Sequence, residues 1–201
     1  MSINVCNDRS MASITSLPSG VTGSSLVLIS EQTASSSANI SFTSGIDSTY
    51  KEYVFKFIDI HPATDAQAFT FNLSADGGSN YNVTKTTTYF LAYHNEGGSS
   101  TTLGYTSSAD LAQSTGEQYL FRDIGNDNDQ SGSGTLHLFD PSSTTFVKHF
   151  TGNFQSYKSD DYTHQNFPAG YGNTTSAVNA IRFKFASGNI DSGTIKMYGV
   201  V

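Results

Sequence analysis

The residues best suited to bind a metal ion lie in the stretch Asp123–Gly134. At their spacing, four of them match the opening of a calcium-binding loop, in which alternate side chains supply oxygen ligands: Asp127, Asp129, Ser131 and Gly132. Leu138 stands near the position where such a loop needs a bidentate glutamate. Asp, Asn and Gly are equally typical of a solvated turn, because they adopt positive φ and hydrogen-bond locally. We favour the turn, leave calcium open and assign no metal ligand.

A second group that could carry chemistry is the acidic pair Asp160 and Asp161, close to His164. Adjacent residues on a strand point to opposite faces, so both carboxylates could serve one site only from a loop. General acid–base catalysis also needs a converging partner, and none can be placed from the sequence. We therefore predict no catalytic residue here.

The remaining reactive residue types show no catalytic or cofactor-binding spacing. No close pair or triplet with Cys or carboxylates, of the kind that transition metals favour, occurs among the histidines: His61, His94, His137, His149 and His164. His137 and His149 lie in alternating segments and are interpreted as half-buried or rim residues. The single cysteine, Cys6, has no nearby base and is predicted to be a free thiol. No phosphate-loop, dinucleotide or nucleophile-elbow fingerprint occurs. The chain is predicted to be no enzyme and to need no cofactor.

Tyrosines offer a different function, recognition by contact. Six of them could stack on sugars or anchor subunit interfaces, where tyrosine combines a large area with a polar tip: Tyr50, Tyr89, Tyr105, Tyr157, Tyr162 and Tyr171. The chain has no Trp, which weakens the sugar reading. We favour interfaces and keep sugar binding as the alternative.

The elements that must position these side chains are strands. Short segments with alternating or continuous apolar residues recur between Gly-, Asn- and Asp-rich turns: 26–30, 38–42, 52–60, 68–74, 83–94, 118–124, 134–139, 145–154, 177–185 and 193–201. Tyr53, Phe55 and Phe57 are expected on one face, as are Ile181, Phe183 and Phe185. Segments 52–60 and 68–74 are expected to pair or be neighbours. The one helix candidate, 108–117, is interpreted as a loop because of Gly116 and its Ser and Thr.

Strands without helical crossovers predict an all-β fold, an antiparallel β-sandwich of jelly-roll or Greek-key type. The 201 residues suit one such domain, residues 26–201, preceded by an extended N-terminal arm, residues 1–25, that is small, polar and without periodicity. A net charge of −7 argues against nucleic-acid partners. The absence of an apolar run of about 20 residues argues against a membrane span.

Three stretches carry a resemblance to a known family. They are EYVFKFIDIHP at 52–62, GSGTLHLFDPSS at 132–143 and NIDSGTIKMYGV at 189–200. From about Ile40 onward the chain resembles virion structural proteins of tailed phages, notably marine and cyanobacterial ones. The resemblance implies a non-enzymatic jelly-roll or similar sandwich, present in several copies on the capsid surface or in the tail. It implies no site residues.

We therefore expect a structural component of a tailed-phage virion, either a capsid decoration or cement protein or a tail or fibre component. Its partners would be other virion proteins and copies of itself, and its location the virion, after synthesis in the host cytoplasm. The alternative is a carbohydrate- or receptor-binding module, and the two can coexist where a tail protein binds a host glycan. A glycan-cleaving enzyme would need two carboxylates roughly 5 to 10 Å apart.

Overall fold

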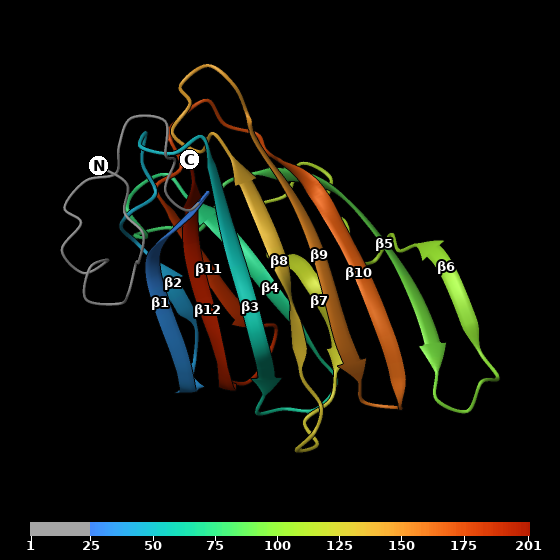
Figure 1. Ribbon diagram of the computed structural model, residues 1–201. Coiled ribbons are helices and arrows are strands. Elements are labelled where there is room, and N and C mark those ends of the chain that lie inside the picture. The colour runs from blue at the N-terminus through green and yellow to red at the C-terminus, as the bar shows by residue number, and fades with distance from the viewer. Residues whose placement is uncertain (1–24) are drawn as a thin grey trace, which may run out of the picture.

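The computed structural model describes residues 25–201, which form twelve strands and no helix (Figure 1). Every ladder between them is antiparallel. The strands are β1 (Leu26–Ser37), β2 (Ile40–Phe42), β3 (Glu52–Pro62), β4 (Gln67–Ser74), β5 (Lys85–Asn95), β6 (Thr101–Tyr105), β7 (Gln118–Ile124), β8 (Gly132–Phe139), β9 (Lys148–Lys158), β10 (Tyr162–Gly172), β11 (Ala180–Phe185) and β12 (Ile190–Val200).

Eight of the strands form a jelly roll. One layer has the order β1-β12-β3-β8 and the other the order β2-β11-β4-β7, so that the chain passes back and forth between two layers. The predicted all-β antiparallel sandwich is confirmed. The two layers meet in a ladder pair at Ile124 of β7 and Lys158 of β9.

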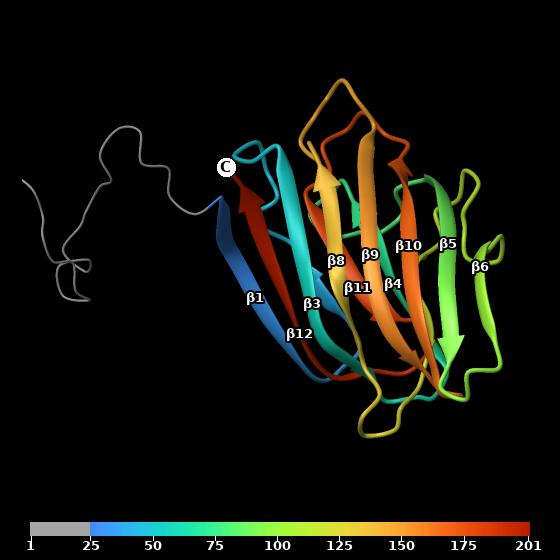
Figure 2. The ribbon, with the colours of Figure 1, turned by 45° about the vertical axis from the view of Figure 1, so that its right-hand side comes forward.

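The other four strands widen the first layer. They add to β8 in the order β9-β10-β5-β6, and Figure 2 shows β6 at the outer edge. We call this layer the long sheet and the layer β2-β11-β4-β7 the short sheet. The short sheet ends at β7, so no strand of the described part of the chain faces the inner side of β5 and β6. The loop between β6 and β7 covers part of this side, since Leu111 N donates to the Thr87 hydroxyl at 2.8 Å and Ala109 packs in a buried cluster with Tyr89.

The core between the layers is built of aromatic rings. Phe183 on β11 lies at its centre, with ring centroids 4.9 Å from Phe57 and 5.4 Å from Phe55. Tyr53, Phe55 and Phe57 share the inward face, as do Ile181, Phe183 and Phe185, so both predicted faces are confirmed. Alternation places these rings because successive side chains of a strand point to opposite faces.

A smaller hydrophobic cluster lies under the extended part of the long sheet. Hydrogen bonds between buried polar groups stabilise it. The Tyr89 hydroxyl donates to Asn166 Oδ1 at 2.6 Å, and the Thr87 hydroxyl donates to Gln118 Oε1 at 2.6 Å. Gln118 Nε2 in turn donates to Ala109 O at 3.0 Å. Because every partner is buried or nearly so, these bonds fix the β6–β7 loop against β5.

Several predicted elements need correction. Segments 101–105 and 162–172 were not predicted as strands but form β6 and β10. β10 contains Pro168, which lacks a backbone N–H, and the β9–β10 ladder is interrupted there, between Asn166 and Ala169. β3 and β4 do not pair: they belong to different layers, and Phe57 and Phe69 meet across the core at 6.0 Å.

The loop reading of residues 108–117 is confirmed, with one isolated bridge between Lys85 and Ser114. Ile58 is exposed while Ile60 is buried, because Asp59 has a φ of 52° and interrupts the alternation. The predicted N-terminal arm, apart from Ser25, and Cys6 with it, lies outside the described residues.

Candidate functional site

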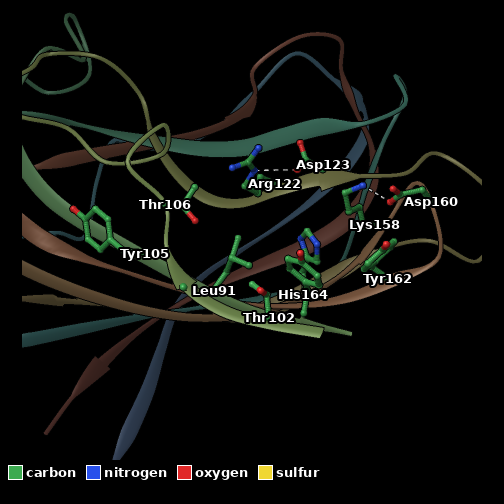
Figure 3. A pocket seen from close by; sticks show the side chains of 12 residues that line it. Leu91, Thr102, Tyr105, Thr106, Arg122, Asp123, Lys158, Asp160, Tyr162 and His164 are labelled. Atoms are coloured by element: carbon green, nitrogen blue, oxygen red, sulfur yellow. Dashed lines mark hydrogen bonds and ion pairs between the residues drawn. The ribbon is translucent and has the colours of Figure 1, made fainter. Parts of the chain in front are cut away.

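A groove lies along one side of the sandwich, where the long sheet extends past β7 (Figure 3). Its volume is ≈ 340 Å³. Inner-face side chains of β5, β6 and β10 form the floor, the end of β7 forms one wall, and the turn between β9 and β10 closes one end. Tyr105 and three clustered rings, Tyr93, Tyr162 and His164, line it together with two pairs of opposite charge.

The three rings are held together by strand pairing. Tyr93 and His164 are directly opposite each other in the β5–β10 ladder. Their ring centroids are 5.7 Å apart, and Tyr162 stands nearly perpendicular to Tyr93 at 5.4 Å. The floor therefore carries two tyrosine rings in an edge-to-face arrangement, beside an imidazole.

His164 is 4% exposed, and its Nδ1 is buried without a hydrogen-bond partner among the described residues. Burial lowers the pKa of His164, and the neighbouring Lys158 and Arg122 act in the same direction, against Asp123 and Asp160. The ring is therefore neutral at pH 7, with one nitrogen able to donate and the other to accept.

The charges of the groove occur in pairs. Arg122 Nε lies 3.0 Å from Asp123 Oδ2, and Lys158 pairs with Asp160 across the β9–β10 turn. The Lys158 ammonium also lies 5.3 Å from the centroid of the Tyr162 ring. With His164 neutral, the site has no net formal charge.

Asp123 reaches the groove through an unusual backbone conformation. Its φ is 58°, in the left-handed region where Asp is enriched among non-glycine residues. Its carbonyl accepts from Ser159 N at 3.1 Å, and Gly125 N donates to Tyr157 O at 3.3 Å. These bonds tie the end of β7 to the end of β9, so both charged pairs lie on one supported rim.

His164 makes stability depend on pH. The unfolded chain binds a proton at the ordinary pKa of 6.5, whereas the folded chain does so only at lower pH. The folded state is thus penalised as pH falls below about 6.5, and its full stability returns above that value. We expect the free energy of unfolding of wild type to fall relative to that of His164→Phe between about pH 7.5 and pH 5, measured by urea unfolding. A difference between the two that is constant across this range would contradict the assignment.

The structure separates the two acidic residues that the sequence placed side by side. Asp160 lines the groove, whereas Asp161 accepts a hydrogen bond from the Tyr157 hydroxyl at 3.2 Å. His164 lies on the floor of the same groove. Arg122, Lys158 and Tyr93 were missed as site residues, and Asp123 was placed only at the start of the predicted calcium or turn segment. Nothing local in the sequence shows which strand lies beside which.

The predicted calcium or turn segment is the connection between β7 and β8. Gln130 N donates to Asp127 O at 2.9 Å, and Gln130 Oε1 accepts from Asp127 N at 3.3 Å. The segment is thus a turn held by hydrogen bonds between its own residues. Within residues 25–201 no group of three or more His, Cys, Asp or Glu is placed to hold a metal ion.

Histidines and tyrosines outside the groove have varied roles. His137 is half-buried and lies 2.6 Å from a Glu52 carboxylate oxygen, as predicted for a strand residue at the rim. His149 is exposed rather than half-buried.

Tyr89 is completely buried, so the prediction that it contacts sugars or partners is wrong. Burial removes the Tyr89 hydroxyl from water and thereby raises the pKa of Tyr89. The hydroxyl donates to Asn166 Oδ1 instead.

Two lysines are fully buried and form internal bonds. Lys85 Nζ donates to Asn72 Oδ1 at 2.5 Å and to Val83 O at 2.9 Å, and burial lowers its pKa to about 8. The nearby Glu117 carboxylate opposes this shift and pairs with Arg182 at 2.6 Å. The other lysine, Lys148, donates to backbone carbonyls of two separate connections.

The outer face of the long sheet carries an apolar area at its free edge. Phe90 is 42% exposed and stacks on Phe167 at 4.8 Å. Leu103 is 74% exposed and Tyr105 59% exposed, and both pair with β5 from the edge strand β6. We call the outer-face residues Phe90, Leu103 and Phe167 the edge patch, and leave out Tyr105 because its side chain also lines the groove.

Fold and surface together define a jelly-roll protein with two surface features on opposite sides of one extended sheet. One is a groove with aromatic rings on its floor and paired charges along it, and the other is the apolar edge patch. Comparisons of the chain with protein-family models, with curated proteins and with solved structures give no match. Among residues 25–201 no helix has the length and apolarity needed to cross a membrane.

Proposed function

We propose that this chain is a structural protein of a tailed-phage particle, held by contacts between neighbouring copies through the edge patch. The resemblance of residues 52–62, 132–143 and 189–200 to phage virion proteins supports the assignment to a phage particle. Jelly-roll sandwiches are used in viral capsids as well as in lectins, so the fold is compatible with the proposal without selecting it.

The observation that carries the proposal is the unprotected edge strand β6. Among residues 25–201, Thr101–Tyr105 pairs only with β5, and its other side is a free edge of the long sheet. Natural edge strands are commonly protected against pairing by charges or proline, and β6 has neither. Exposed apolar side chains beside such an edge are typical of a protein contact.

Self-association tests this contact. We expect the wild-type chain to form oligomers whose population rises with concentration in light scattering coupled to gel filtration. Leu103→Lys places a charge in the edge patch and is expected to shift the chain to monomer. The matched control is Thr151→Lys, an exposed position on the same outer face, three strands from β6.

A wild-type chain that stays monomeric at every concentration would refute contacts between copies. The particle assignment is tested separately, by mass spectrometry of purified particles of the phage that encodes the chain. Absence of the chain from such particles would overturn it.

A further inference from the structure

We propose that the groove between β7 and the inner face of β5, β6 and β10 is a binding site for a short, uncharged saccharide. The proposal goes beyond the structural role, because the groove lies on the opposite side of β5 from the edge patch. A subunit joined to its neighbours through that patch would still present the groove.

The first argument is the unpartnered imidazole. Nδ1 of His164 is buried and unpaired, and a buried polar group without a partner costs about 1–3 kcal/mol. Because the ring is neutral, one nitrogen donates and the other accepts. Nδ1 itself is enclosed, so a sugar hydroxyl in the groove can bond it only after a small shift of the ring. A hydroxyl can both donate and accept, so such a bond is possible in either tautomer.

The second argument is charge balance. Arg122 is paired with Asp123, and Lys158 with Asp160, so neither an anion nor a cation meets an uncompensated opposite charge. Paired guanidinium and carboxylate groups still have unused donors and acceptors in fixed planes. Adjacent hydroxyls of a pyranose ring match such planar groups, because each hydroxyl pair offers two donors and two acceptors at fixed spacing.

The third argument is the aromatic floor. One face of a pyranose ring is made of C–H groups, which pack on the negative face of an aromatic ring. Tyr93 and Tyr162 are partly buried and nearly perpendicular, with an interplanar angle of 78°. A ring lying on one tyrosine therefore has its edge next to the other.

The groove also has suitable size and access. Its volume of ≈ 340 Å³ is near the lower end of the range for small-molecule sites, about 300–1,000 Å³. Gly104 lies on its floor, and a Cβ added there would meet no atom within 4 Å. A larger side chain at this position would therefore enter the groove without disturbing the packing.

Isothermal titration calorimetry with named probes tests the proposal. The probes are glucose, galactose, mannose and N-acetylglucosamine with their disaccharides, and N-acetylneuraminic acid and inorganic phosphate as charged comparators. We expect at least one neutral sugar to bind. Gly104→Val, which fills the groove, is expected to abolish binding, and His164→Phe, which keeps a ring but removes the nitrogens, to weaken it about 10-fold.

The matched control is Thr163→Val, next to His164 but on the outer face, which is expected to leave the affinity unchanged. Failure of every neutral sugar to bind would overturn the proposal. So would phosphate or N-acetylneuraminic acid as the only ligand, or sugar binding that Gly104→Val leaves intact. Neither result bears on self-association, which is measured without sugar.

Discussion

Replacing Phe183 by alanine is expected to lower the free energy of unfolding by about 3–5 kcal/mol. The Phe183 ring is fully buried, and its contacts join both layers of the jelly roll. Besides Phe55 and Phe57 of the long sheet, it packs on Phe69 of the short sheet at 6.3 Å. Alanine would leave a cavity among rings that strand pairing prevents from closing in. Urea unfolding measures the change.

Two variants make this result specific. Phe183→Leu keeps most of the volume and should cost less than about 1.5 kcal/mol. Phe146→Ala removes an exposed ring, 68% accessible, and should change stability by less than about 0.5 kcal/mol. A loss below about 1 kcal/mol for Phe183→Ala would show that Phe183 is not the centre of the core.

Replacing Lys148 by methionine is expected to cost about 3 kcal/mol, although methionine is more apolar. The ammonium group of this buried lysine donates to three backbone carbonyls, Ser143 O at 2.6 Å, Phe146 O at 2.7 Å and Thr174 O at 3.2 Å. They belong to two connections, β8–β9 and β10–β11, which the single ammonium group thus joins. Methionine would leave these carbonyls without a donor.

The control for this prediction is Lys51→Met at the same end of the sandwich. Lys51 pairs with Asp140 at 3.0 Å, but its side chain is 78% exposed, so the pair contributes little. Thermal unfolding of both variants should show a clear drop for Lys148→Met and almost none for Lys51→Met. Equal effects would mean that the Lys148 bonds do not stabilise the two connections.

Part of the fold follows from local pattern alone. Alternation of Phe and Tyr with polar residues placed Phe183 and Phe57 on inward faces, and the turn-rich composition between such segments predicted an antiparallel sandwich. Both inferences depend on the two-residue period of a strand, and this period can be recognised within one short segment of sequence. β6 and β10 were not predicted as strands because Thr, Gly, Asn and Pro168 obscure that period.

The groove was not accessible to the same reasoning. Tyr162 and His164 were noted as single residues, but their meeting with Tyr93 depends on β10 pairing with β5, and the approach of Arg122 depends on β7 ending the short sheet. Such pairings join segments far apart in the chain, and their register is decided by the packing of both layers at once. The sequence by itself determined which residues point inward along each strand. Only the tertiary structure decided which strands lie together, and hence that one stretch of the long sheet is left uncovered with these side chains lining it.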